Sequence, residues 1–181
     1  MQDLLIVVDM QNDFVNGSLG TKEAKNIVSN VVAKCENYAY TRYREIVFTK
    51  DTHCQNYLNS FEGRNLPIEH CIKGTYGWDI IESLQKFIKN NNSNVIEKPT
   101  FAYMNWSQVI NTICDEKGMS IHSIELCGLC TDICVISNAL VLRGLYHNME
   151  IVVDSNSCAG VTPEKHKAAL EVMKSCQIEV I

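Results

Sequence analysis

Apolar residues recur along the chain in short runs rich in Val, Ile and Leu, and longer, more polar segments separate these runs. Runs of this length, bounded by polar or turn residues, are typical of buried strands. The sequence therefore predicts six strands, at Leu4–Val8, Glu45–Thr49, Asn94–Ile96, His122–Cys127, Glu150–Val153 and Gln177–Ile181.

The segments between these runs place apolar residues three and four positions apart, as on the buried face of a helix. The first segment carries Ala24, Ile27, Val28, Val31 and Val32, and the second carries Trp78, Ile81, Leu84, Phe87 and Ile88. Three further helices are predicted, at Trp106–Glu116, Asp132–Leu145 and Pro163–Cys176. Thr162, directly before Pro163, stands where a helix-capping residue is expected.

This alternation of strands and helices is typical of an α/β fold in which right-handed crossovers connect parallel strands. We therefore expect a three-layer sandwich, with a six-stranded parallel sheet and helices on both of its faces. A chain of 181 residues has the size of one domain, so residues 1–181 are expected to form a single domain.

The composition is that of an ordered globular protein, with 46% hydrophobic and 20% charged residues. The net charge of -5, without a dense Lys/Arg cluster, argues against a nucleic-acid partner. No apolar stretch has the length of a membrane span and no signal peptide is evident, so we expect a cytoplasmic protein without a membrane partner. The nine cysteines are an odd number and are expected to remain reduced.

Reactive side chains follow four of the predicted strands. In strand order these are Asp9, Asp51 with His53, Lys98, and the segment Cys127–Cys134. Parallel sheets bind ligands beyond the carboxyl ends of their strands. The sequence therefore predicts one functional site that contains these residues.

Cys134 is the candidate nucleophile of this site. It lies near the start of the predicted helix, where the helix dipole and free N–H groups favour a thiolate and can hold an oxyanion. Asp9 is the candidate general base, and Lys98 would stabilise the developing charge. Taken singly, a Cys is more often a small buried side chain, an Asp a cap and a Lys a surface residue. Their joint placement favours catalysis.

The cysteine spacing permits a second interpretation. Cys127, Cys130 and Cys134 have a C-x2-C-x3-C spacing that resembles some iron–sulfur ligand sets. No fourth cysteine lies nearby, and Cys127 falls within a predicted strand. We therefore favour a nucleophile over a metal cluster.

Five motifs resemble, in their order, those of the isochorismatase-like cysteine hydrolases, and the resemblance covers nearly the whole chain. They are V-V-D-M-Q-N-D-F at 7–14, T-K-D-T-H at 49–53, H-C-I-K-G-T-Y-G at 70–77, E-K-P-T-F at 97–101 and G-L-C-T-D-I-C-V at 128–135. The resemblance implies a Rossmann-like fold and a catalytic triad of Asp9, Lys98 and Cys134.

The resemblance also implies roles for residues around the nucleophile. It places a cis peptide bond between Leu129 and Cys130, and an oxyanion hole at the N–H groups of Cys130 and Cys134. Cys130 departs from the small residue, usually Ala, that the family has at this position. Phe14 resembles an aromatic wall of the substrate pocket, although ordinary core packing explains it equally well.

Nicotinamidases, the members that this chain resembles most, hold a divalent ion that engages the pyridine nitrogen of their substrate. Asp51, His53 and His70 match their ligand set. Many nicotinamidases have another His where this chain has Tyr57, and Glu62 is a reasonable replacement ligand. Two His and two carboxylates suit Zn²⁺, Mn²⁺ or Fe²⁺. The alternative is that the two histidines only cap the loop and hold no metal.

Together, the residues and the resemblance predict hydrolysis of a small planar amide, with nicotinamide first, through a thioester. The runner-up is a related amidase for another small amide, such as an N-carbamoyl compound. Isochorismate ether hydrolysis would leave Asp51, His53 and His70 without a use. The intact triad argues against a non-catalytic interaction module. The resemblance and the apolar helix faces are also compatible with a homo-oligomer.

Overall fold

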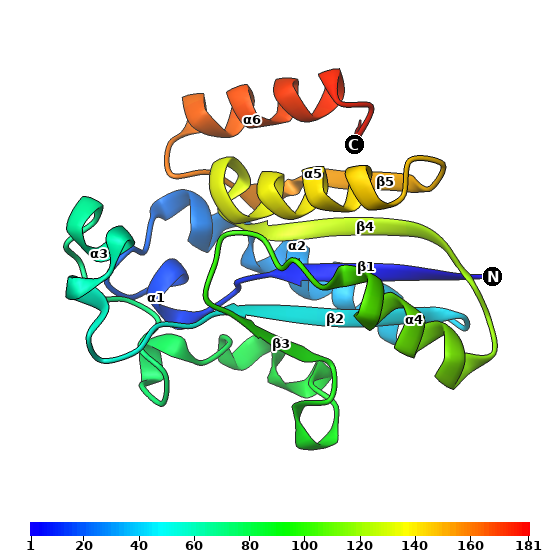
Figure 1. The fold of residues 1–181 in the computed structure, drawn as a ribbon, viewed down its shortest axis with the longest axis horizontal. Coiled ribbons are helices and arrows are strands. Elements are labelled where there is room, and N and C mark those ends of the chain that lie inside the picture. Colours follow the sequence, from blue (N-terminus) through cyan, green and yellow to red (C-terminus); the bar gives the residue numbers. More distant parts are fainter.

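The computed structural model describes residues 1–181. Its strands are β1 (Gln2–Val8), β2 (Arg44–Asp51), β3 (Val95–Lys98), β4 (Ile121–Leu129), β5 (Glu150–Ala159) and β6 (Glu179–Val180). They form one parallel sheet in the order β3-β2-β1-β4-β5-β6 (Figure 1). The predicted α/β fold with a six-stranded parallel sheet is confirmed.

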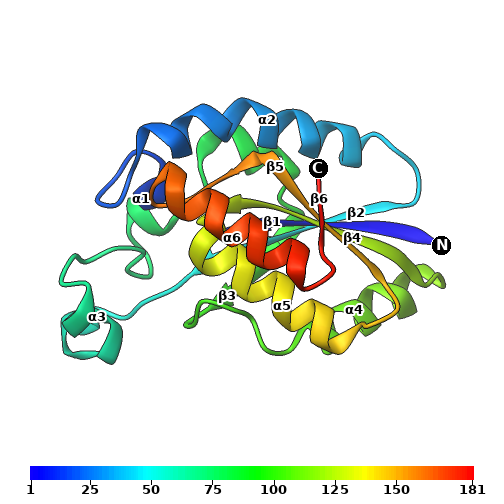
Figure 2. The same cartoon turned by 90° about the horizontal axis from the view of Figure 1, so that it is seen from above.

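Helices cover both faces of this sheet. They are α1 (Asn12–Val15), α2 (Lys22–Ala39), α3 (Phe61–Asn65), α4 (Trp106–Lys117), α5 (Ile136–Leu145) and α6 (Pro163–Ser175). Figure 2 shows α2 on one face of the sheet and α4 and α5 on the other, while α6 packs beside α5 and against β6. None of the helices is both long enough and apolar enough to cross a membrane.

The middle of the sheet is apolar because helices cover it on both sides. Every residue of Leu4–Val8 in β1 is fully buried, as expected for the continuous apolar run of an inner parallel strand. Val31 from α2 and Leu142 from α5 are fully buried in the same core. This packing holds the ends of the inner strands in fixed positions.

Short polar residues mark the starts of two long helices. The Thr162 hydroxyl accepts a hydrogen bond from the Lys165 N–H, and Pro163 occupies the first turn of α6. Thr21 caps α2 in the same way, through the N–H of Ala24. The predicted cap at Thr162 is confirmed.

The helix predicted over Trp78–Ile88 is wrong. The structure has two 3-10 turns there, Tyr76–Trp78 and Glu82–Phe87. Between them, the Asp79 carbonyl accepts a 2.9 Å hydrogen bond from the Asn12 N–H, and the Ile81 N–H donates to the Met10 carbonyl at 3.0 Å. This pairing keeps the intervening backbone extended and interrupts a segment whose apolar spacing otherwise suits a helix.

The helix predicted over Asp132–Leu145 begins differently from the prediction. Thr131–Val135 forms a π-helical turn that contains Cys134, and α5 begins only at Ile136. The short helices α1 and α3 were not predicted, because four or five residues are too few to show a helical period.

Candidate active site

The parallel strands β1, β3 and β4 bring the predicted catalytic residues to one edge of the sheet. The carboxyl ends of these strands point toward α1 and α3 (Figure 1). Asp9 directly follows β1, Lys98 is the last residue of β3, and Cys134 follows β4 after a short turn. Three residues that are far apart in the sequence therefore lie at the same edge.

Asp9 and Lys98 form a buried ion pair. Lys98 Nζ lies 2.6 Å from Asp9 Oδ2, and both side chains are fully buried. The other carboxylate oxygen, Oδ1, accepts a 2.6 Å hydrogen bond from the Thr49 hydroxyl. Asp9 has a φ of 47°, a left-handed conformation that Asp tolerates better than most residues. Both oxygens of this carboxylate are thus held in place.

Burial and charge set the proton affinities of this pair. Burial raises the pKa of Asp9 above its ordinary value, although the Lys98 ammonium opposes the shift. Burial lowers the pKa of Lys98, but the negative charges of Asp9, Cys134 and Asp51 outweigh this effect and raise it overall. Lys98 therefore stays protonated, and Asp9 is a stronger base than an exposed carboxylate.

The Cys134 thiol completes this group. Its Sγ lies 3.5 Å from Lys98 Nζ, and the residue is only 5% exposed. Burial, followed by the charge of Asp9, raises the pKa of the thiol well above its ordinary value. The expectation that the helix start would favour a thiolate is therefore wrong. A thiol at rest needs a base, which the adjacent Asp9–Lys98 pair can supply.

A tight turn presents Cys134. The Cys130 carbonyl accepts hydrogen bonds from the N–H groups of Ile133 at 3.1 Å and Val135 at 3.0 Å. The Cys130 N–H itself has no acceptor within the chain. The Leu129–Cys130 peptide bond is cis, at the position that the resemblance implies. The turn thus holds an unpaired N–H close to the candidate nucleophile, as an oxyanion hole requires.

Gly128 permits the close approach of β4 to β1 directly before this turn. Its φ is 115°, and a Cβ atom built on it would lie 2.1 Å from the Val8 carbonyl oxygen. Glycine alone has both the backbone freedom and the space for this contact. Because Val8 directly precedes Asp9, the contact brings the nucleophile turn close to the candidate base.

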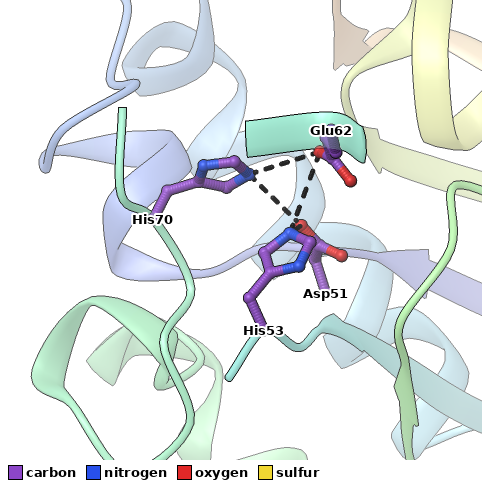
Figure 3. Close-up of side chains that lie close together, drawn as sticks. All are labelled: Asp51, His53, Glu62 and His70. Carbon is purple, nitrogen blue, oxygen red and sulfur yellow. Dashed lines mark hydrogen bonds and ion pairs between the residues drawn. The ribbon is translucent and has the colours of Figure 1, made fainter. Parts of the chain in front are cut away.

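Four side chains from β2 and the connection after it point toward one another (Figure 3). They are Asp51, His53, Glu62 and His70, and one ligand atom of each lies within 4.8 Å of all the others. Asp51 Oδ2 is 3.0 Å from His53 Nε2 and 3.5 Å from His70 Nε2. Glu62 Oε1 lies 3.8 Å and 3.7 Å from the same two nitrogens. The structure thus brings all four predicted metal ligands together.

The chemistry of these four groups fits a divalent ion. Ligand atoms about 2.1 Å from a tetrahedral ion lie roughly 3.4 Å apart, within the range of the observed separations. His70 Nδ1 lies 2.8 Å from the Ile68 carbonyl oxygen and must donate to it. In the neutral ring, Nε2 is then left as an acceptor that faces Asp51 and Glu62, as metal binding requires.

The two carboxylates concentrate negative charge in this cluster. Burial and the charge of Asp51 raise the pKa of Glu62. Burial alone would raise the pKa of Asp51 too, but a hydrogen bond from His53, and one from His70 when its ring carries a proton on both nitrogens, outweigh burial and hold that pKa well below its usual range. A bound cation would neutralise this charge.

Sequence analysis missed two residues that support the cluster. The Tyr57 ring packs against both imidazoles, with its centroid 4.6 Å from that of His53 and 4.9 Å from that of His70. Gln11 accepts a 2.7 Å hydrogen bond from the Asp51 N–H and donates at 2.8 Å to the Asp51 carbonyl. In the sequence, only its place within the motif at 7–14 points to Gln11. Tyr57 is noted there only because it stands where many nicotinamidases have another His ligand.

One cavity of about 350 Å³ joins the thiol to the ligand cluster. Cys134 lines it together with Asp51, Glu62 and His70, and Phe14 forms part of its wall, 5.6 Å from the His70 ring. Small-molecule pockets start at about 300 Å³, so a single-ring ligand fits here. Cavities of about 340 and 410 Å³ near the amino ends of β2 and β3 have no Cys or His in their linings.

The cysteines do not gather into a ligand set of their own. Cys127 is fully buried in the core, whereas Cys130 and Cys134 line the cavity. The only converging group of His, Cys, Asp and Glu side chains is the cluster around Asp51. The geometry therefore argues against the iron–sulfur interpretation.

Known proteins that are similar to this chain include nicotinamidases and pyrazinamidases. Nicotinamidase of Schizosaccharomyces pombe is 27% identical over 98% of this chain and 91% of its own length. The structure of nicotinamidase/pyrazinamidase from Bacillus subtilis has a TM-score of 0.81 at 27% identity, covering 99% of each chain. Pyrazinamidase of Pyrococcus horikoshii in complex with zinc has a TM-score of 0.79 at 28% identity, covering 100% of this chain and 99% of that one. The model of the isochorismatase domain matches residues 3–181, and the chain therefore belongs to the isochorismatase family.

Proposed function

We propose that this protein is a cysteine-dependent amidohydrolase that converts nicotinamide to nicotinic acid and ammonia. The cavity that Cys134 shares with Asp51, Glu62 and His70 carries the proposal. A thiol at one end can attack an amide carbonyl, and a ligand cluster at the other can hold an ion that binds a ring nitrogen. A pyridine carboxamide has both groups, an amide carbonyl for the thiol and a ring nitrogen for the ion. Similarity to nicotinamidases and pyrazinamidases supports amide hydrolysis.

In the acylation step, Cys134 Sγ bonds to the amide carbonyl carbon. The thiol proton passes to Asp9, whose raised pKa suits this transfer. Lys98, 2.6 Å from Asp9, stabilises the charges that develop. The carbonyl oxygen becomes an oxyanion beside the N–H groups of Cys130 and Cys134. The amide nitrogen then takes the proton from Asp9 and leaves as ammonia, so a thioester remains on Cys134.

In the deacylation step, a water molecule attacks the carbonyl carbon of the thioester. Asp9 accepts one proton from this water and returns it to the Cys134 sulfur as the carbon–sulfur bond breaks. The product leaves as a carboxylic acid, which ionises, and the free thiol is restored. One general base therefore serves both halves of the reaction.

Asp51, His53, Glu62 and His70 would hold a divalent metal ion, for which the zinc in the Pyrococcus horikoshii pyrazinamidase structure is a precedent. When bound, this ion would take the ring nitrogen as a ligand in addition to the four protein groups. None of the four ligands contacts Cys134 in the scheme above, so their role is to orient the ring, with Phe14 as one wall. Zn²⁺ is the first choice of metal, and Mn²⁺ or Fe²⁺ are the alternatives.

An ammonia-release screen of small amides, run with and without a chelator, tests this proposal. We expect the zinc-loaded protein to hydrolyse nicotinamide faster than an N-carbamoyl amino acid, and we expect chelation to slow the nicotinamide reaction. A folded, metal-containing protein that releases no ammonia from nicotinamide would refute the proposed substrate. Release from the N-carbamoyl compound alone would assign the chain to the related amidases.

A further inference from the structure

Asn138 of α5 is a fully buried amide, and all of its hydrogen-bonding capacity is used. Its Nδ2 donates to the Cys134 carbonyl at 2.8 Å and to the Phe101 carbonyl at 3.1 Å. Its Oδ1 accepts from the Tyr103 N–H and from Trp106 Nε1, both at 2.9 Å. An Asn side chain offers two donors and two acceptor positions, so no position is left over.

These four contacts join two segments that carry different parts of the candidate site. One segment is the nucleophile turn, which Asn138 reaches through the Cys134 backbone. The other is the connection from β3 to α4, which begins after Lys98 and includes Phe101, a residue that lines the cavity. Lys98 Nζ is itself tied to this connection, because it donates to the Thr100 carbonyl at 3.2 Å.

We infer that Asn138 is a positioning residue that sets the placement of Cys134 relative to Lys98. The expected effect of Asn138 on the rate of catalysis rests on the proposed function. The 3.5 Å contact between Cys134 Sγ and Lys98 Nζ is the only direct link between the two side chains. The Asn138 side chain supplies a second link, because it joins the backbone of Cys134 to the backbone of the connection that follows Lys98. This link does not depend on the protonation of the thiol. Misplacing a reacting group by about 1 Å can cost about a hundred-fold in rate.

Asn138→Asp isolates this role, because it preserves the shape of the side chain. The carboxylate keeps an acceptor for Tyr103 and Trp106, but it has no hydrogen to donate to the carbonyls of Cys134 and Phe101. We expect kcat for nicotinamide to fall at least about ten-fold, with a smaller change in KM. We also expect the rate of iodoacetamide labelling at Cys134 to change by a similar factor, since this rate reports on the surroundings of the thiol.

Asn94 offers a matched control elsewhere in the fold. It is also buried, its Nδ2 donates to the carbonyls of Ile46 and Phe87, and its Oδ1 accepts from the Lys89 N–H. Asn94→Asp therefore also removes two hydrogen bonds from a side-chain amide to backbone carbonyls, but these two lie at the amino end of β3, away from the candidate site. It should lower the melting temperature about as much as Asn138→Asp while leaving kcat and Cys134 labelling within about two-fold of the parent.

A conservative variant separates the two links. A Ser at position 138 can donate to the carbonyl four residues earlier, which belongs to Cys134, but it is too short to hold the β3–α4 connection. Asn138→Ser should therefore recover part of the kcat that Asn138→Asp loses. If Asn138→Asp does not fold, the comparison of Asn138→Ser with Asn94→Ser replaces it.

Equal kcat and equal labelling rates in Asn138→Asp and Asn94→Asp would overturn the inference, because general loss of stability would then explain both variants. The labelling measurement needs no substrate. A parent protein that hydrolyses no amide would therefore refute the proposed function, while the labelling rates would still decide the role of Asn138.

Discussion

Lys98 Nζ lies 2.6 Å from Asp9 Oδ2, and neither side chain reaches solvent. Two opposite charges in such a place depend on each other, because removing one leaves the other buried without a partner. The Cys134 thiol lies against this pair, with its sulfur 3.5 Å from Lys98 Nζ. The pair is thus both a structural element and the proton-handling part of the proposed mechanism.

The ion pair predicts a pH-dependent loss of stability in Lys98→Met. Removing Lys98 leaves Asp9 without the charge that opposes its burial, so its folded pKa rises further above 3.8, the ordinary value. A carboxyl whose pKa is raised by folding stabilises the protein below its unfolded pKa and loses this contribution as pH rises through the folded pKa. At neutral pH we expect the free energy of unfolding to fall by about 3–5 kcal/mol.

The double variant Asp9→Asn with Lys98→Met isolates this titration. It has no buried carboxyl at position 9, so its stability relative to Lys98→Met should increase as pH rises from below 3.8 toward neutrality. Urea unfolding of both variants across this range measures the difference. A constant difference at all pH values would show that Asp9 does not titrate in this way.

The residues of one catalytic group are expected to show non-additive losses of activity. Asp9→Asn removes the base, and Cys134→Ala removes the group that the base serves. Combining them should cost little more in kcat/KM than Cys134→Ala alone. The test compares ammonia release by the two single variants and the double variant, and additive losses in ln(kcat/KM) would argue against a shared mechanism.

The raised pKa of Cys134 predicts the pH dependence of its alkylation. Burial holds the resting residue as a thiol, with a pKa well above the ordinary 9.0. Because the thiolate is the reactive form, labelling by iodoacetamide should still increase with pH above 9.0. Mass spectrometry of the peptide that contains Cys134 gives this rate. A plateau below that pH would instead indicate a resting thiolate.

Metal removal should affect substrates according to their ring nitrogen. We expect chelation, or His53→Ala, to slow nicotinamide hydrolysis strongly and to slow benzamide hydrolysis much less, because benzamide has no ring nitrogen to bind the ion. Labelling of Cys134 should change little, since no proposed ligand activates the thiol. Metal analysis should find about one equivalent in the parent and less in His53→Ala.

An equal loss for nicotinamide and benzamide would show that the ion has another role. Unchanged nicotinamide hydrolysis in a verified metal-free protein would remove the ion from the mechanism altogether. A matched control is His147→Ala, since His147 is exposed and lies in the turn between α5 and β5, outside the ligand cluster.

The sheet and the gathering of Asp9, Lys98 and Cys134 could be predicted because both depend on short-range patterns. Apolar runs mark parallel strands, and parallel strands bring their carboxyl ends to one edge. The metal-ligand cluster could be predicted only through the resemblance of the motifs, because no strand or helix periodicity relates His53 to Glu62 or to His70.

Features that depend on contacts between distant segments could not be predicted. The segment from Trp78 has the spacing of a helix, but its backbone pairs with residues after β1. The sequence places Cys134 at a helix start, yet burial, which the sequence does not reveal, dominates its pKa. Asn138 lies in a mostly apolar helix, and only the packed structure shows the four groups that it joins.

The central claim is that Cys134 attacks the amide carbonyl of nicotinamide. Ammonia release from nicotinamide by zinc-loaded Cys134→Ala, measured beside the parent and a Cys130→Ala control, tests it most directly. The account predicts no release above background from a folded Cys134→Ala protein, while Cys130→Ala, which lacks the other thiol of the cavity, keeps measurable activity. Release at the parent rate from folded Cys134→Ala would contradict the account.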